Sequence, residues 1–231
     1  MPVISSNEYL DMAQMKINAQ SIMTKMLAQG WSKNAICGIL GNMETESTMN
    51  SGLWESLSYG NMSGGFGLVQ WTPASIITSW MDAHGFANNW ASVDGQLAKL
   101  NAEVLDGSQW YTTSLYTMTF PEFKISKEPA EKLARAFIAN YERPRNPDQP
   151  IRGEQAKKWF DTLGGGGNIE SAVQWMLDTA KDESHGYDQN SRWGPDYDCA
   201  SFVITGYESA GIKLKTNGAT YTRSEERRVG K

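Results

Sequence analysis

The chain has 231 residues, of which 40% are hydrophobic and 20% are charged, so it is long enough for more than one core and lies outside the composition range of disordered proteins. Its net charge of −5 argues against non-specific binding of nucleic acid, because phosphate binding depends on clustered lysine and arginine. No apolar run reaches the roughly 20 residues that cross a bilayer, and residues 1–14 lack a signal-peptide pattern, so neither a membrane partner nor classical secretion is expected.

Residues 1–163 are expected to form one mostly helical domain. Apolar residues from Met12 to Leu27 recur at helical spacing, and Gly30 is a suitable end for this helix. A second helix is expected after Ser32, which is a favourable N-cap residue. Further helices are expected over residues 96–105, 129–141 and 152–163.

The remaining parts of the chain that carry a signal are residues 60–72, the glycine run and the stretch after it. Residues 60–72 are rich in glycine and aromatic residues and lack a helical period, which favours a small β-hairpin or irregular sheet. The glycine run at residues 164–168 predicts a flexible linker. Beyond it, apolar spacing from Ile169 to Ala180 indicates an amphipathic helix, and another is expected to begin at Cys199.

Two neighbouring glutamates near the end of the second helix have different predicted environments. On a helical projection, Glu46 lies about 50° from the centre of the apolar face and Glu44 about 110° away. We therefore expect Glu44 to be solvated and Glu46 to lie at the rim of the core, where desolvation favours a protonated carboxyl group. A general acid needs this environment, because it must keep its proton until a glycosidic oxygen receives it. An ordinary ion pair or loop cap at Glu46 is the alternative.

Two motifs surround this glutamate. Residues 41–47, GNMETES, and residues 65–72, GFGLVQWT, resemble the lysozyme superfamily arrangement of a Glu-Ser helix end followed by a Gly-x-x-Gln hairpin. The closer resemblance is to the phage tail lysozyme family, and it continues through residues 141–144, YERP, to about Leu163. It implies a lysozyme-like domain over essentially the whole of residues 1–163.

The resemblance also implies an activity. It indicates a muramidase, a glycoside hydrolase that cleaves the β-1,4 glycan strand between N-acetylmuramic acid and N-acetylglucosamine, with Glu46 as the general acid. Gln70, Trp71 and Thr72 would line the sugar cleft. Trp71 fits a place in the core as well as it fits stacking on a sugar ring.

The sequence does not identify a second catalytic carboxylate. A retaining glycosidase needs one about 5 Å from the acid, and an inverting enzyme needs a base further away. Between Glu46 and Trp71 the candidate is Glu55, which matches no motif of the family. Inverting, substrate-assisted and lytic transglycosylase mechanisms all remain open.

Cys199 is the second candidate catalytic residue. It is expected at the start of a helix with Asp198 as N-cap, where the helix dipole favours a thiolate. A small buried apolar residue is the alternative, and it is the interpretation that we prefer for Cys37. The stretch from Ala172 to Ile212 resembles the phage amidase and NlpC-type cysteine peptidase families, which implies a papain-like domain that cuts the stem peptide or the amide bond with Cys199 as nucleophile.

This second resemblance is incomplete. Those families take their base from a histidine downstream of the cysteine, whereas His84 and His185 both precede it. Residues 223–231, RSEERRVGK, resemble a translated sequencing-library adapter, so we expect the natural chain to continue past Thr222. Residues 169–222 would then be an incomplete domain, unstable and inactive as written.

The expected fold class is α+β: a mostly helical lysozyme-like domain with a small β-hairpin, followed by a truncated papain-like α+β domain. The leading hypothesis is a muramidase of the phage virion tail that opens the Gram-positive wall so that DNA can enter, with peptidoglycan and phage tail proteins as partners. An endolysin, a conjugation-type wall hydrolase and a non-catalytic wall-binding tail module are the alternatives. No metal or other cofactor is expected, because the histidines are few and scattered and no phosphate-binding loop is present.

Overall fold

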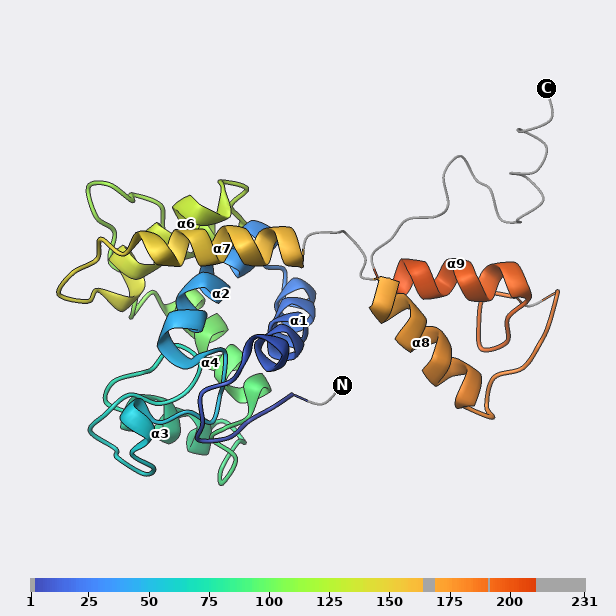
Figure 1. Ribbon diagram of the computed structural model, residues 1–231, viewed down its shortest axis with the longest axis horizontal. Helices are drawn as coiled ribbons and strands as arrows, with labels where there is room; N and C mark the ends of the chain where they lie inside the picture. Colours follow the sequence, from blue (N-terminus) through green and yellow to red (C-terminus); the bar gives the residue numbers. More distant parts are fainter. Residues whose placement is uncertain (1–2, 164–168, 191, 211–231) are drawn as a thin grey trace. The chain divides into compact units, whose positions relative to one another are not determined.

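The chain divides into two compact units, Met1–Asp161 and Thr162–Lys231. The computed structural model describes residues 3–163, 169–190 and 192–210 (Figure 1). The linker expected at 164–168, the region around Thr222 and the stretch 223–231 lie outside the described residues.

The first unit is built from helices. In chain order they are α1 (Met12–Ala28), α2 (Lys33–Ser47), the 3-10 turn η1 (Glu55–Leu57), α3 (Ser75–Ala83), α4 (Val93–Asp106), α5 (Phe120–Ile125), α6 (Ala130–Phe137), the π-helix η2 (Ile138–Glu142) and α7 (Pro150–Thr162). The described part of the second unit holds α8 (Ile169–Lys181) and α9 (Cys199–Ser209).

Most expected helices are present. The Ser32 side chain caps α2 by accepting a hydrogen bond from the backbone N–H of Ala35, as the sequence predicts. The helix expected over residues 129–141 instead divides, because α6 ends at Phe137 and a π-helical turn follows it. The sequence interpretation did not identify α3 and α5.

The expected α+β fold class is wrong, because the described residues contain isolated bridge pairs and no β-sheet. In place of the hairpin at 60–72, Phe66 and Trp71 exchange backbone hydrogen bonds around a tight turn. The pairing does not extend outward, because the next hydrogen-bonded pair would join residues 64 and 73, and Pro73 has no N–H while the Gly64 N–H donates to the Asn61 carbonyl. A papain-like α+β domain is likewise not found among the described residues of the second unit, in which α8 and α9 pack on each other with a loop between them.

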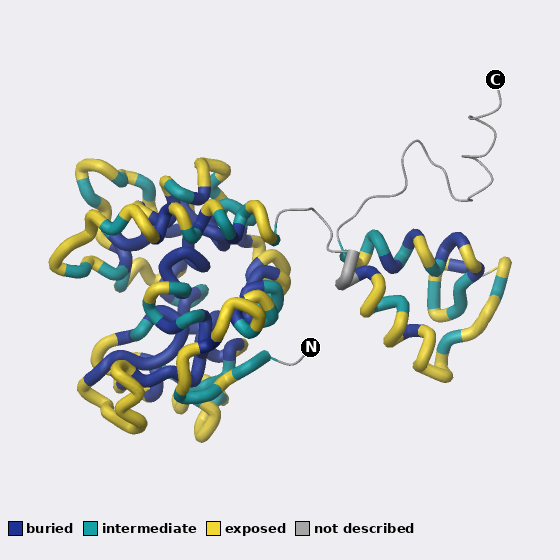
Figure 2. The backbone as a smooth tube through the Cα atoms, in the orientation of Figure 1, coloured by how far each residue is buried: buried dark blue, intermediate teal, exposed yellow. Residues whose placement is uncertain are grey.

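The core of the first unit surrounds α2. Every residue from Ala35 to Met43 is buried, including Cys37, as expected (Figure 2). Two glycines allow neighbouring backbones to approach. A Cβ added at Gly38 would lie 2.9 Å from the Leu133 Cβ atom on α6, and one at Gly41 would lie 2.7 Å from the Ala156 nitrogen on α7. The α2 helix is therefore held against two later helices.

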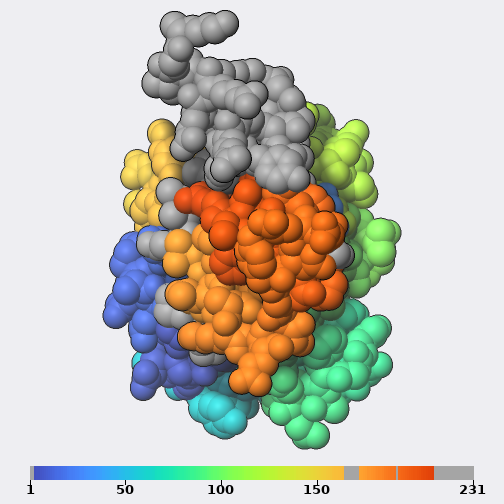
Figure 3. Space-filling view, turned by 90° about the vertical axis from the view of Figure 1, so that its right-hand side faces the viewer, coloured from blue at the N-terminus to red at the C-terminus, as the bar shows by residue number. Residues whose placement is uncertain are grey.

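The second unit packs through one face of each helix. Ala172 of α8 and Ile204 of α9 are buried, and the ring of Trp175 contacts those of Tyr197 and Phe202. Figure 3 shows the side chains of this unit in orange and red. Among the described residues of the whole chain, no helix is both long and apolar enough to cross a membrane.

Candidate active site

A pocket of about 240 Å³ lies at the C-terminal end of α2. Its walls include Glu46, Gln70, Trp71 and Thr72, so the structure brings together all the residues that the sequence places in a sugar cleft. Glu142, from η2, lines the same pocket. Three segments that are far apart in the sequence thus form one concave surface.

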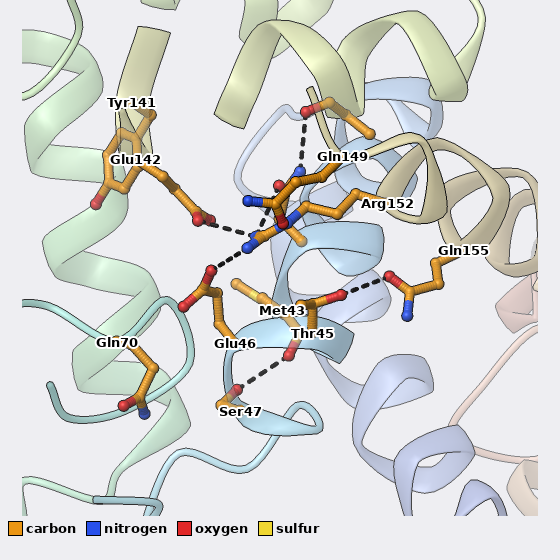
Figure 4. A network of polar contacts seen from close by, with 12 residues as sticks. Met43, Thr45, Glu46, Ser47, Gln70, Tyr141, Glu142, Gln149, Arg152 and Gln155 are labelled. Atoms are coloured by element: carbon orange, nitrogen blue, oxygen red, sulfur yellow. Dashed lines mark hydrogen bonds and ion pairs between the residues drawn. The ribbon is translucent and has the colours of Figure 1, made fainter. Parts of the chain in front are cut away.

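Glu46 is held by an arginine from α7. Arg152 donates from Nη2 to Glu46 Oε1 at 2.5 Å, and the Glu46 side chain is 22% exposed. Figure 4 shows the two side chains pointing toward each other. Glu46 is therefore at the boundary between the core and the pocket, with one carboxyl oxygen fixed by a buried cation.

A second carboxyl group meets the same arginine. Arg152 donates from Nη1 to Glu142 Oε2 at 3.0 Å, so its guanidinium group bridges the two acids. Burial raises the pKa of Glu142 well above its ordinary value, and the negative charge of Glu46 acts in the same direction. The positive charge of Arg152 opposes both effects without cancelling them, so the pKa of Glu142 stays raised.

The wider π-helical turn brings Glu142 to this position. The Arg143 N–H donates to the Ile138 carbonyl, a hydrogen bond that spans five residues. Below it, the Tyr141 ring stacks on Phe137 with centroids 4.4 Å apart. The sequence interpretation missed Glu142 because it sought a second carboxylate between Glu46 and the Gly-x-x-Gln motif only. The signal that was available is the YERP motif at 141–144.

The guanidinium of Arg152 is buried and is held by several hydrogen bonds. The side chain is 5% exposed, and it also donates to Asn42 Oδ1 at 3.1 Å and to Gln149 Oε1 at 2.8 Å. Asn42 in turn donates to carbonyl groups of α2 and α6. Because its partners come from α2, from η2 and from the residue just before α7, Arg152 has little freedom to leave the two glutamates.

The environment predicted for Glu44 is wrong. Its side chain is 12% exposed, less than that of Glu46, and it binds Lys158 and the indole N–H of Trp159, each at 2.6 Å. The helical projection placed it in solvent because it considered one helix, whereas α7 covers this side of α2. Glu44 does not line the pocket around Glu46.

The wall opposite Glu46 is fixed by hydrogen bonds. Ser47 donates to the Leu68 carbonyl at 2.8 Å, which ties the end of α2 to the turn that carries Gln70. The Gln70 side chain donates its N–H groups to the Leu53 and Gly67 carbonyls, each at 3.0 Å. Its amide nitrogen is therefore occupied within the protein, and its oxygen is the atom that remains for a ligand.

Trp71 lies between the pocket and the core. It is 5% exposed, and its indole N–H donates to Glu103 of α4 at 3.3 Å. Glu103 also accepts from Tyr141 at 2.5 Å and pairs with Lys99 at 3.0 Å. Burial raises the pKa of Glu103 despite these partners. Of the two alternatives for Trp71, a buried wall of the pocket fits this environment better than an exposed stacking platform.

Glu55, the carboxylate that the sequence offers as a second acid, lies away from the pocket. It is exposed and accepts a hydrogen bond from the Gly65 N–H at 2.8 Å. Its position is that of a loop cap.

Cys199 begins α9, and the Asp198 side chain caps the helix through the Ser201 N–H, as predicted. The cysteine is exposed and lines a pocket of about 270 Å³. His185 lines this pocket too, so a histidine upstream of the cysteine shares its site. The His185 ring is held through Nδ1, which lies 2.6 Å from the Pro195 carbonyl oxygen. Among the described residues, no group of histidine, cysteine and carboxylate side chains is arranged to hold a metal ion.

Comparison with known proteins covers the first unit. Residues 17–163 match the sequence model of the family described as phage tail lysozyme. Over 164 residues the chain is 51% identical to morphogenesis protein 1 of Bacillus phage B103. That alignment covers 71% of this chain and 44% of the phage protein, so the chain spans less than half of the length of this relative.

Proposed function

The chain belongs to the phage tail lysozyme family, and we propose that its first unit hydrolyses peptidoglycan at the β-1,4 bond between N-acetylmuramic acid and N-acetylglucosamine. The observation that carries this proposal is the position of Glu46 at the rim of a pocket that Gln70, Trp71 and Thr72 also line. A carboxyl group in such a place meets the geometric need of a general acid, since one side faces the ligand and the other faces fixed protein groups.

In this reaction Glu46 gives a proton to the glycosidic oxygen as the bond to the anomeric carbon breaks. The sugar that remains carries positive charge in the transition state, which a nearby carboxylate stabilises. A water molecule then adds its hydroxyl group to the anomeric carbon. Attack by a hydroxyl of the sugar itself would instead give an anhydro end, the product of a lytic transglycosylase.

In the full-length form of the second domain, the thiol of Cys199 is the proposed nucleophile of a second wall-cleaving activity, directed at the stem peptide or its amide bond. An exposed cysteine at a helix start, in a pocket with a histidine, supports this role. The two activities together would cut both the glycan and the peptide parts of the wall.

We place this activity on the phage virion tail, with tail proteins as assembly partners and the host cell wall as the site of action. The family supports this placement, as does a relative whose name denotes phage morphogenesis. Neighbouring genes distinguish this setting from the alternatives: tail genes support it, whereas a holin gene would indicate an endolysin and secretion genes a conjugation-type hydrolase.

The decisive experiment is mass spectrometry of fragments released from purified Gram-positive peptidoglycan. The wild-type chain is compared with Glu46→Gln and with Glu44→Gln, a matched control on the same helix whose carboxylate also binds α7. We expect reducing muramic acid ends from the wild type and the control, and about 100-fold less from Glu46→Gln.

Each other result has a defined meaning. Anhydro ends that depend on Glu46 would make the chain a lytic transglycosylase. If none of the three chains releases fragments but all still bind the wall, the chain is a wall-binding module rather than an enzyme. Equal release by wild type and Glu46→Gln would remove Glu46 from the reaction.

A further inference from the structure

Two carboxyl groups that line the pocket share one buried guanidinium. Arg152 contacts Glu46 through Nη2 and Glu142 through Nη1, and the side chains of Arg152 and Glu142 are nearly inaccessible. With both acids ionised, the cluster would carry one uncompensated negative charge in a desolvated place, which is costly. With one proton between the acids, the cluster is neutral.

One atom of Glu142 indicates where that proton lies. Its Oε2 accepts from Arg152, whereas its Oε1 is buried and has no hydrogen-bond partner. A buried oxygen without a donor is rare in folded proteins. A proton on Oε1 removes this conflict, because the group then becomes a donor, and a carboxyl-to-carboxyl hydrogen bond to Glu46 becomes available.

Among the described charged and titratable groups around Glu142, Glu46 is the one that can share its proton. From α2 it faces Glu46, and from α7 it faces Arg152. Its neighbour Tyr141 directs its hydroxyl to Glu103 on α4, so that group is already engaged. The guanidinium of Arg143 points to backbone carbonyls of residues 109, 140 and 141.

We propose that Glu142 is a positioning residue that shares one proton with Glu46 beside Arg152 and passes it to Glu46 when a glycan fills the pocket. The inference rests on the proposed function and adds a second carboxyl group to it. Before the transfer Glu142 is neutral and Glu46 is paired with Arg152. After it, Glu46 is the neutral acid and Arg152 keeps a charged partner in Glu142, so the net charge does not change.

The complete cycle balances. Glu46 releases the proton to the glycosidic oxygen, which keeps the electron pair of the broken bond to carbon. Both carboxyl groups are then ionised, and the resulting net negative charge stabilises the positive sugar. Water adds a hydroxyl group to that carbon, and its remaining proton returns to the pair of acids. One bond is hydrolysed and the pair again holds one proton.

The first test is the pH profile of glycan cleavage by Glu142→Gln. Glutamine keeps the shape and can still accept from Arg152, but it cannot hand over a proton. We expect kcat to fall about 100-fold with KM changed less than about threefold, and we expect the alkaline limb of activity to move to lower pH, because Glu46 then faces Arg152 without a neighbouring acid. Glu142→Asp should recover part of the rate.

Glu44→Gln is the control, because its carboxylate links α2 to α7, as the contact of Glu46 with Arg152 does, but outside the pocket. It should keep both the rate and the pH profile. If the Glu142→Gln enzyme keeps the wild-type pH profile, whatever its reaction rate, then Glu142 only supports the fold and the proposal is contradicted.

The second test does not depend on activity. Carbon NMR of glutamate carboxyl groups follows the titration of Glu142 in the wild-type chain and in Glu46→Gln. We expect Glu142 to lose its proton at lower pH in the variant, since the opposing charge has gone. Unchanged titration would overturn the shared proton. A shift without glycan release from the wild type would support the shared proton while contradicting the proposed function.

Discussion

Each unit of the chain presents a reactive side chain at the end of a helix, but the two sites are assembled differently. Glu46, at the end of α2, meets Arg152 across 106 positions of sequence. The pocket of Cys199, at the start of α9, is lined by residues that lie between Thr179 and Phe202. The first site therefore depends on the packing of distant helices, whereas the second is formed by one local stretch.

This contrast teaches where each site is vulnerable. Glu142 has its pKa governed by partners on other elements, and Glu46 is held by Arg152 of α7, so any change that separates α2 from α7 affects the site. Cys199 needs its helix cap and its loop, both of which are adjacent in sequence. Experiments that compare the two units directly can test this difference, and the largest effect is expected for the reaction rates of the two cysteine thiols.

Thiol alkylation should separate Cys37 from Cys199 by more than about 1,000-fold in rate. Burial raises the pKa of Cys37 to about 12, so at pH 8 only about one thiol in 10,000 is the reactive thiolate. Cys199 is exposed and should react with iodoacetamide at an ordinary rate. Peptide mass spectrometry of the native chain measures both, with a denatured sample as control in which both must react. Equal native rates would mean that α2 is not buried as described.

The contact glycines provide the next test. Gly41→Ala should destabilise the first unit by about 2–3 kcal/mol, because the new Cβ meets backbone atoms of α7 that cannot move aside. Gly206→Ala on α9 should destabilise the second unit by about 1–2 kcal/mol, since the new Cβ would lie 2.6 Å from the Met176 Cγ atom, a side chain rather than backbone, and alanine favours helix.

Urea unfolding followed by hydrogen exchange in each unit gives the two free energies of unfolding. The comparison fails if Gly206→Ala is the more damaging change. Glycan cleavage by Gly41→Ala should fall together with its stability, because Arg152 lies on the displaced segment.

The pH dependence of stability should have a definite sign in the first unit. The pKa of Glu142 is raised in the folded state, so between its ordinary value of 4.5 and this raised pKa unfolding releases a proton. Its contribution to stability is therefore full at acid pH and decreases as pH rises, by up to about 1.4 kcal/mol per pH unit. Glu103 acts with the same sign. Glu142→Gln should flatten this slope in unfolding curves between pH 5 and 8, and an unchanged slope would contradict the assignment.

Asp198 should show the smallest effect, with the opposite sign. Burial acts to raise its pKa, but hydrogen bonds with Ser201 and the charge of Arg192 outweigh burial and lower it. Its contribution is therefore present at neutral pH and lost as pH falls below its usual range. Asp198→Asn keeps the cap but removes the charge that pairs with Arg192 at 2.9 Å, and it should cost about 1 kcal/mol at pH 7. A larger loss would show that the ion pair with Arg192, rather than the cap, orders the start of α9.

The sequence predicts local features of this molecule better than distant contacts. The Ser32 cap, the buried Cys37 and the helix start at Cys199 follow from neighbouring residues, and all three are present. The hairpin stops at Phe66 and Trp71, because Pro73 has no N–H and the Gly64 N–H donates to the Asn61 carbonyl.

The candidate site shows the same limit. Its predicted residues share a pocket, but their roles remain a proposal. The environment of Glu44 and the approach of Glu142 both arise from α7 and η2, about 100 positions further along the chain. No helical period within α2 contains that information. To find the contact of Glu142 with the site, one would have had to expect that the YERP motif lies beside the Glu-Ser motif in the fold.

The π-helical turn at Ile138–Glu142 makes the length of the chain, as well as its composition, a determinant of the site. Loss of one residue from this turn would restore ordinary helical spacing and rotate each later side chain by about 100°. The acid of η2 would then leave Arg152 even though no residue of the motif had been replaced. A single deletion of this kind would separate the two carboxyl groups in one evolutionary step, a change that a survey of substitutions alone would not detect.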